Sequence, residues 1–146
     1  MKIAIGCDPN AQDAKEQLIR YIQNQGYGEI TDFGSTDPVY AHTAIRLAES
    51  VAAKEYDRGI LICGTGIGVC VAANKVKGAY AALVSDVYSA ERARLSNDAN
   101  IACMGAFTTG EKVREQMVDA FLTSEFAAGC PSQPKVDAFV EYDNAR

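Results

Sequence analysis

The hydrophobic positions along the chain alternate between two periods, and this alternation predicts the order of its elements. Short apolar runs are each followed by a segment whose apolar residues recur at helical spacing. The runs expected to form strands are Lys2 to Cys7, Glu29 to Phe33, Arg58 to Cys63, Ala79 to Val84 and Ile101 to Met104. These strands are apolar on both faces, as in a parallel sheet that helices cover on both sides. The pattern therefore predicts an α/β fold with a five-stranded parallel sheet.

The predicted helices lie between these strands. Gly26 is expected to end the first helix, and the apolar stretch Val69 to Asn74 is expected to form a short helix after the third strand. The other helical faces run within Tyr40 to Val51, Tyr88 to Leu95 and Val113 to Phe121. Beyond Phe126, a glycine and two prolines predict an irregular tail with only a weak segment at Val136 to Tyr142.

Length, charge and cysteine spacing narrow the class of protein. At 146 residues the chain is expected to form one domain, residues 1–146. Its net charge of −5 argues against nucleic acid or an anionic membrane as a partner. We expect no membrane span and no signal peptide, because Met1 leads directly into a strand pattern. The five cysteines lack framework spacing, so we expect reduced thiols in a cytoplasmic protein.

The stretch from Gly59 to Asn74, GILICGTGIGVCVAAN, carries the candidate chemistry. A strand ends at Cys63, a glycine-rich turn runs from Gly64 to Gly68, and a helix is expected to follow. This geometry directs backbone N–H groups and the positive end of a helix dipole at one point. An anion is stabilised there, and the thiolate form of a cysteine is favoured. We therefore interpret Cys63 as the reacting group, against the alternative of a buried structural thiol.

A second candidate residue faces Cys63 if the sheet is wound as expected. Ligands of open parallel sheets bind beyond the carboxyl ends of the strands, where the winding direction reverses. A flavodoxin-like strand order places that point between the first and third strands. Asp8 follows the first strand and Cys63 ends the third, so the two residues are expected to meet across a crevice. The alternative role for Asp8 is to cap the helix that follows it.

Four segments extend this pattern and come in a characteristic order: IAIGCD (Ile3 to Asp8), DRGILICGTGIG (Asp57 to Gly68), AANK (Ala72 to Lys75) and NDAN (Asn97 to Asn100). Together they resemble the ribose-5-phosphate isomerase B family, which includes the two subunits of galactose-6-phosphate isomerase. The resemblance runs from Met1 to about Phe126 and leaves residues 126–146 as a divergent tail.

The resemblance implies a Rossmann-like three-layer α/β/α sandwich and an aldose–ketose isomerase that acts on a small sugar or sugar phosphate. It also implies that the enzyme needs no metal and no organic cofactor. The partners it implies are the sugar and a second copy of the chain, in a homodimer or a dimer of dimers whose active sites are shared between chains.

The resemblance assigns catalytic roles to three residues. Cys63 would be the base that moves a proton between C1 and C2 of the open-chain sugar through an enediolate. Thr65 would orient the thiol by hydrogen bonding, and Asn97 would lie beside the enediolate. The residues that would bind the substrate are Asp8 and Tyr40, on its hydroxyl groups, and the turn residues Gly64, Gly66, Ile67 and Gly68, through amides that stabilise the developing charge.

The chain departs from the family where the family opens and holds a cyclic sugar phosphate. Pro9 and Ser96 occupy positions where the family has histidines, the second of which opens the ring. Phe107 takes the place of an arginine after the fifth strand. The tail from Gly129 to Pro134 lacks the arginines that hold the phosphate.

These departures leave three hypotheses open. The first is an isomerase for a different substrate, either unphosphorylated or unable to form a ring, such as a four-carbon sugar phosphate. The second is the cysteine-bearing subunit of a hetero-oligomeric sugar-phosphate isomerase, completed by a paralogous subunit. The third is a non-catalytic sugar-binding relative.

Two polar residues also have simple structural interpretations. Asn97 could turn the chain before the fifth strand. His42, the only histidine, is interpreted as an exposed residue at a helix start, with the hypothesis that it replaces the lost acid. Cys7, Cys63 and His42 lack the local spacing of metal ligands, so no metal site is expected.

Overall fold

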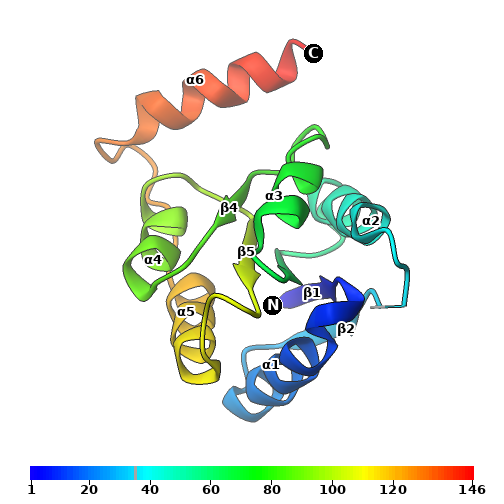
Figure 1. Cartoon of the computed structure of the whole chain (residues 1–146). Helices are drawn as coiled ribbons and strands as arrows, with labels where there is room; N and C mark the ends of the chain where they lie inside the picture. Colours follow the sequence, from blue (N-terminus) through cyan, green and yellow to red (C-terminus); the bar gives the residue numbers. More distant parts are fainter. Residues whose placement is uncertain (35) are drawn as a thin grey trace.

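The computed structural model describes residues 1–34 and 36–146, and a parallel sheet lies at its centre. The strands are β1 (Lys2–Cys7), β2 (Glu29–Asp32), β3 (Arg58–Cys63), β4 (Ala81–Leu83) and β5 (Ile101–Gly105). Helices cover both faces of the sheet (Figure 1). The five-stranded parallel sheet and the three-layer α/β/α sandwich expected from the sequence are confirmed.

The strands follow the order β2-β1-β3-β5-β4, so the winding direction reverses between β1 and β3, as expected. A flavodoxin-like order would continue with β4 and then β5. The structure exchanges these last two strands. The reason lies in their side chains, because β5 is buried along its whole length whereas Leu83 of the short strand β4 is 45% exposed. The more exposed strand therefore occupies the edge.

The helices form two layers around two hydrophobic cores. One face of the sheet carries α1 (Gln12–Gln25), α4 (Val87–Leu95) and α5 (Glu111–Thr123), and the other carries α2 (Tyr40–Ala52) and α3 (Ile67–Ala73). Successive side chains of a strand point to opposite faces. Ile60 and Ile62 of β3 accordingly join the first core, while Leu61 and Cys63 join the second. The Cys63 side chain is thus directed toward the layer of α2 and α3.

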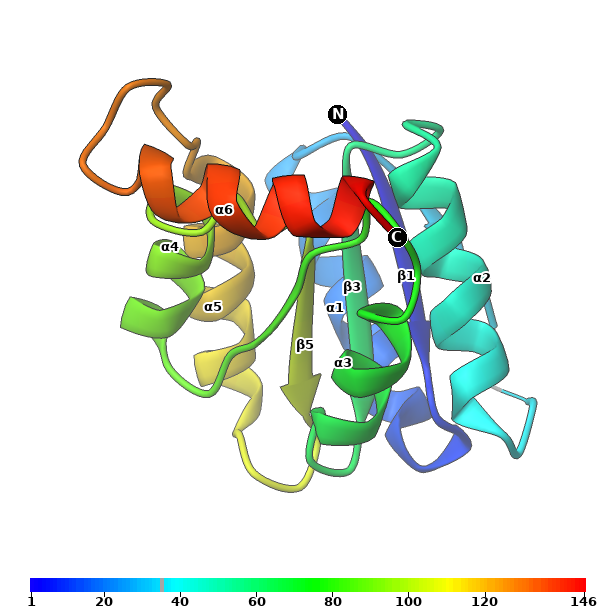
Figure 2. The ribbon, with the colours of Figure 1, turned by 90° about the horizontal axis from the view of Figure 1, so that it is seen from above.

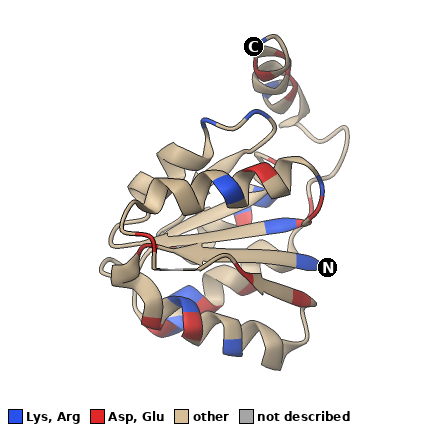
Figure 3. Cartoon of the chain, turned by 90° about the vertical axis from the view of Figure 1, so that its right-hand side faces the viewer, with Lys and Arg blue, Asp and Glu red and all other residues tan. Residues whose placement is uncertain are grey.

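Most helix ends lie close to their predicted positions. Gly26 ends α1 in the left-handed conformation, as expected, with a φ of 70°. The short helix after β3 was expected from Val69, but α3 begins at Ile67 because Gly66 already adopts its cap conformation, with a φ of 80°. Lys and Arg are interspersed with Asp and Glu on the outer helices (Figure 3). Among the described residues, no helix is both long and apolar enough to span a membrane.

The tail contains a helix that the sequence did not predict. Residues 124–132 contain no helix or strand, as expected, and α6 (Gln133–Asn144) contains the weak segment predicted at Val136 to Tyr142. The helix begins three residues earlier, with Pro134 in its first turn, where a proline costs no hydrogen bond. Its Phe139 ring lies 5.3 Å from the ring of Tyr80. In Figure 2, α6 lies near the amino ends of the strands, and the β5 arrow points away from it. The irregular stretch was therefore predicted correctly, whereas the helical character and full length of the segment after it were not.

The carboxylate of Asp143 attaches the end of α6 to the body of the protein. It accepts hydrogen bonds from the Gly78 amide at 2.7 Å and from the Tyr80 hydroxyl at 3.1 Å, and it pairs with Arg146. The Gly78 amide, with Arg146 as the next cause, lowers the pKa of this carboxyl group below its ordinary value. The charged form of Asp143 thus holds the last turn of α6 in place.

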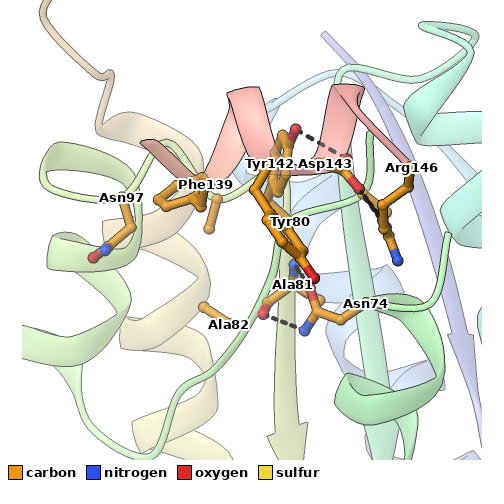
Figure 4. A pocket seen from close by; sticks show the side chains of 11 residues that line it. Asn74, Tyr80, Ala81, Ala82, Asn97, Phe139, Tyr142, Asp143 and Arg146 are labelled. Atoms are coloured by element: carbon orange, nitrogen blue, oxygen red, sulfur yellow. Dashed lines mark hydrogen bonds and ion pairs between the residues drawn. The ribbon is translucent and has the colours of Figure 1, made fainter. Parts of the chain in front are cut away.

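The outer edge of β4 is closed by a side chain. The Asn74 amide nitrogen donates to the Ala81 carbonyl at 2.8 Å, and the Ala81 N–H donates to the Asn74 side-chain oxygen at 2.9 Å (Figure 4). Asn74 thereby makes with Ala81 the pair of bonds that a further strand would otherwise make.

Candidate active site

The turn after β3 is held against β5. The Ala106 N–H donates to the Cys63 carbonyl at 2.8 Å, and the Phe107 N–H donates to the Gly64 carbonyl at 2.9 Å. At Gly66, a Cβ atom would lie 2.8 Å from the backbone of Met104 in β5. A side chain at position 66 would therefore clash with the backbone of a central strand. It would also be strained by the positive φ, which glycine adopts readily and other residues do not.

The turn presents an amide to the sulfur of Cys63. This side chain is 6% exposed, and its Sγ accepts a hydrogen bond from the Gly66 N–H at 3.0 Å. An amide in this position stabilises negative charge on the sulfur. The residue also lines a cavity of about 300 Å³ at the carboxyl ends of β1, β3 and β5. Cys63 is therefore a mostly buried thiol with one open side.

The structure brings most of the predicted site residues to this cavity. Its lining residues are Asp8, Asn10, Tyr40, Cys63, Gly64, Thr65, Gly68 and Phe107. The expectation that Asp8 and Cys63 meet across the crevice at the switch point is confirmed by this placement. The described residues that line the cavity include one carboxylate and no positively charged side chain.

The hydrogen bonds of Asp8 and Thr65 refine the roles expected for them. An oxygen of the Asp8 carboxylate accepts from the Asn10 N–H at 2.8 Å and so caps the short 3-10 helix η1 (Pro9–Ala11). Asp8 therefore caps a helix and lines the cavity at once. The Thr65 hydroxyl accepts from the Ile67 N–H at 3.3 Å. The Cys63 sulfur accepts its hydrogen bond from the Gly66 amide, so the expected orienting role of Thr65 stays a prediction.

Tyr40 reaches the turn because position 68 has no side chain. A Cβ atom at Gly68 would lie 2.2 Å from the Tyr40 hydroxyl oxygen and 2.5 Å from the ring carbon that bears it. Tyr40 begins α2, and Gly68 lies in the first turn of α3. The glycine thus lets the phenol of one helix approach the start of the other beside Cys63.

Three predicted residues lie outside the lining of the cavity. Gly66 contributes through its amide, and the side chain of Ile67 is 54% exposed at the start of α3. Asn97 precedes β5 and so lies at its amino end, whereas Cys63 is at the carboxyl end of β3. It lines a separate pocket of about 460 Å³ beneath α6 (Figure 4). A single copy of the chain therefore does not bring Asn97 to Cys63.

His42 also lies apart from the cavity. Its Nδ1 is 3.0 Å from a carboxylate oxygen of Asp37, and its side chain is largely exposed. It is absent from the residues that line the Cys63 cavity. The interpretation of His42 as an exposed residue at a helix start agrees with this position.

Sequence reasoning did not expect Asn10 to line the cavity, and it noted Phe107 only as the replacement of an arginine. Asn10 follows β1 and Phe107 follows β5, so both stand just beyond carboxyl ends of strands. That is the general position of ligand-binding residues in such sheets. The signal was therefore present, and it was overlooked because the motif search concentrated on the glycine turn.

Two further thiols lie in the same core as Cys63 but do not line the cavity. Burial raises the pKa of Cys103 well above its ordinary value, so this residue stays a neutral thiol. A hydrogen bond from Cys103 lowers the pKa of Cys70. Within the described residues, no group of three or more His, Cys, Asp and Glu side chains is placed to hold a metal ion.

The fold and the site together define a class of protein. A doubly wound sheet with a cavity at its switch point is the arrangement of an enzyme or binding protein for a small molecule. A cysteine with an amide on its sulfur, surrounded by hydroxyl and carboxylate groups, can exchange protons with a bound polar molecule.

Comparison with known proteins identifies the family. Residues 3–139 match the family model described as Ribose/Galactose Isomerase. The chain is 47% identical over 146 residues to a protein of Listeria innocua named ribose-5-P isomerase B, covering 98% of this chain and 97% of that protein. It is 40% identical over 148 residues to a D-erythrulose-4-phosphate isomerase of Pectobacterium atrosepticum, covering 99% and 96%. The chain belongs to the ribose/galactose isomerase family.

A solved structure agrees with this assignment. The ribose-5-phosphate isomerase B of Clostridium thermocellum matches with a TM-score of 0.92 at 36% identity, covering 99% of both chains. The protein is accordingly a sugar-phosphate isomerase of the aldose–ketose type, and the resemblance recognised in the sequence is confirmed.

Proposed function

We propose that the protein interconverts a short aldose and its ketose through a proton transfer by Cys63, and that its preferred substrate is a four-carbon sugar phosphate. The observation that supports the chemistry most strongly is the cavity in which the Cys63 sulfur, held by the Gly66 amide, meets Asp8, Tyr40 and Thr65. These groups provide a base and several hydrogen-bonding partners for a polyhydroxylated molecule.

The proton transfer involves a single base. From the aldose side, the Cys63 thiolate removes the proton from C2. The electron pair of that C–H bond forms the C1=C2 double bond, and negative charge develops on O1. Return of the proton to C1 and movement of the O2 hydroxyl proton to O1 complete the ketose. The same group acts first as base and then as acid, so the proton taken from C2 is the one returned to C1.

The developing charge on the substrate oxygens requires donors that are already in place. In the turn, the Gly66 amide is occupied by the sulfur and the Ile67 amide by the Thr65 hydroxyl. The amides of Thr65 and Gly68 have no hydrogen-bond acceptor among the residues that the structure describes. They are the donors that we assign to the enediolate, while the Tyr40 and Asp8 side chains position hydroxyl groups.

The choice of a four-carbon substrate follows from the residues around the cavity. A pentose or hexose phosphate is mostly cyclic and needs an acid to open its ring. Ser96 occupies the position of the family's ring-opening histidine, and His42, the only histidine of the sequence, does not line the cavity. A tetrose 4-phosphate cannot close a furanose ring, because its 4-hydroxyl group is esterified, and so it needs no such acid. The relative named D-erythrulose-4-phosphate isomerase, which is 40% identical, supports this choice. The second candidate is ribose 5-phosphate, which is favoured by the 47% identical relative.

We assign Asn97 to the active site of a second copy. Within one chain it lies beneath α6, at the opposite end of the sheet from Cys63. A face of α3 and the adjoining edge strand exposes large apolar side chains, namely Ile67 (54%), Val71 (56%) and Leu83 (45%). Such a patch is typical of a subunit interface. A symmetric dimer formed there would bring the α3 end of one copy, next to Cys63, toward the pocket of its partner.

Cys63→Ala tests the mechanism. The variant removes one small, mostly buried group, so the fold should persist. We expect it to lose incorporation of solvent deuterium at C1 and C2, which reports enediolate formation even where net conversion is slow. Cys130→Ala is the matched control, because Cys130 lies in the loop between α5 and α6 and does not line the cavity. A folded Cys63→Ala protein that still exchanged these protons would overturn the mechanism.

A panel of phosphorylated and free sugars of four to six carbons tests the substrate. The proposal expects the highest kcat/KM for the tetrose phosphate. Higher activity with ribose 5-phosphate would select the second candidate. Activity only after addition of a paralogous subunit would select the hetero-oligomer, and binding without deuterium exchange would select the non-catalytic relative.

Mixing two inactive variants tests the shared site. If Cys63 and Asn97 of different copies meet, random pairing of Cys63→Ala with Asn97→Ala subunits restores one intact site in each mixed dimer, or about a quarter of full activity. Each variant alone is expected to be nearly inactive. A mixture no more active than the two variants measured separately would reject a role for Asn97 in the partner's site.

A further inference from the structure

The wall of the cavity that follows β5 carries an exposed aromatic ring. Phe107 lines the same cavity as Cys63 and Asp8, and its side chain is 73% exposed. Leaving a phenyl ring in water forgoes the free energy of burying it. A ring exposed to this degree inside a cavity is available to be covered by whatever occupies that cavity.

The backbone and the ring of Phe107 are both fixed against the glycine turn. Its N–H donates to the Gly64 carbonyl at 2.9 Å, and the preceding residue, Ala106, donates to the Cys63 carbonyl at 2.8 Å. A Cβ atom built on Gly64 would lie 2.9 and 3.0 Å from two carbons of the ring. The ring therefore occupies the space where a side chain of residue 64 would project, immediately next to the residue after Cys63.

The two ends of the turn are thus flanked by aromatic rings of different character. Tyr40 packs on Gly68 and brings a hydroxyl group, whereas Phe107 packs on Gly64 and brings only carbon. The other polar lining residues, Asp8 and Asn10, follow β1, the strand on the other side of the switch point from β3. The cavity consequently has a hydrogen-bonding side and an apolar side.

We propose that Phe107 is a specificity-determining residue that packs on the C–H face of a short open-chain substrate. This inference rests on the proposed function. Sugar carbons present C–H groups that pack favourably on an aromatic ring while the hydroxyl groups face polar partners. An anionic group laid against the ring would lose hydration, and no described lining residue carries a positive charge to compensate it. The phosphate therefore has to lie away from the ring, and the bulk of the ring within a cavity of about 300 Å³ favours a four-carbon chain over a longer one.

The prediction concerns selectivity more than the rate of chemistry. The Phe107 side chain has no part in the proposed proton transfer, and only its backbone is bonded to the turn that holds Cys63. Removing the ring should therefore act mainly on KM. Phe107→Ala is expected to lower the ratio of kcat/KM for a tetrose phosphate to kcat/KM for ribose 5-phosphate by roughly fivefold, the equivalent of one aromatic contact. Phe107→Leu keeps apolar bulk and should change the ratio by less than about twofold.

The experiment measures kcat and KM for both substrates with wild type, Phe107→Ala and Phe107→Leu. Tyr88→Ala serves as the matched control, because Tyr88 is an equally exposed aromatic residue (72%) that does not line this cavity. Thermal unfolding and sedimentation are recorded in parallel. An unchanged substrate ratio in Phe107→Ala, or a change confined to the oligomeric state, overturns the inference while leaving the isomerase intact. Wild-type protein inactive on every sugar would instead reject the proposed function.

Discussion

Substituting Gly68 by alanine should lower the activity of the enzyme much more than its stability. The added Cβ atom would lie 2.2 Å from the Tyr40 hydroxyl oxygen and 2.5 and 2.7 Å from two of its ring carbons. All three atoms belong to the far end of one side chain, which can rotate away. Overpacking costs about 1–3 kcal/mol, whereas replacing glycine by alanine within a helix gains up to about 1 kcal/mol. The net loss of stability is therefore expected to lie between about 0 and 3 kcal/mol, a Tm decrease of at most roughly ten degrees.

The effect on activity should be larger, because Tyr40 cannot rotate away and still contact the substrate. Loss of one hydrogen bond to a substrate hydroxyl corresponds to about 1–3 kcal/mol, or roughly a 5- to 150-fold decrease in kcat/KM. The assay combines steady-state kinetics with urea denaturation. Gly110→Ala is the matched control, because a Cβ atom at that position meets nothing within 4 Å and the residue has an ordinary φ of −77°.

A double-mutant cycle identifies the cause of the effect. In a Tyr40→Ala background the obstacle is gone, so adding Gly68→Ala should be neutral or slightly stabilising. Two results would contradict this reasoning. One is full activity of the Gly68→Ala enzyme. The other is a destabilisation by Gly68→Ala that is just as large when Tyr40 is absent.

Three further predictions concern the frame of the site. Gly66→Ala should destabilise the fold by about 2–4 kcal/mol in urea denaturation, because position 66 needs a positive φ and its new Cβ atom would lie 2.8 Å from the β5 backbone. The hydrogen bond to Asp119 raises the pKa of Tyr21 to about 12, so its contribution to stability is present below pH 10 and lost between pH 10 and 12. Tyr21→Phe should therefore show a smaller fall in unfolding free energy than wild type over that range. Asp143→Asn should detach α6, seen as faster hydrogen exchange there, and wild type should approach this behaviour only below pH 3.8, because the Gly78 amide lowers the pKa of Asp143.

The sequence predicted those parts of the structure that depend on local signals. The bounds of β1 and β3 follow from apolar runs that end at Asp8 and at a glycine turn, and both strands were predicted to the residue. The same signals placed Asp8 and Cys63 at one cavity. Strand order is not local, and the exchange of β4 and β5 depends on which strand can be buried on both faces and both edges.

The parts that were not predicted depend on contacts between distant residues. Helix α6 has little helical periodicity, and it is held by Asp143 on Gly78 and by Phe139 on Tyr80. The motif around Asn97 was recognised and placed before the fifth strand, so its position at the amino end of β5, away from Cys63, could already be read from the sequence. Phe107 was noted only as the replacement of a family arginine, and the pairing of β5 with β3 is what brings it beside Cys63.

The side-chain amide of Asn74 both donates to and accepts from the backbone of Ala81, so these backbone groups of the edge strand are not free to pair with another strand. Two copies of this chain cannot join strand to strand through that position of β4, so an assembly formed there has to use complementary side-chain surfaces. An assembly of that kind stops at a defined number of subunits, whereas strand-to-strand addition can continue without limit. A single asparagine thus contributes to keeping the protein in discrete particles and out of fibres.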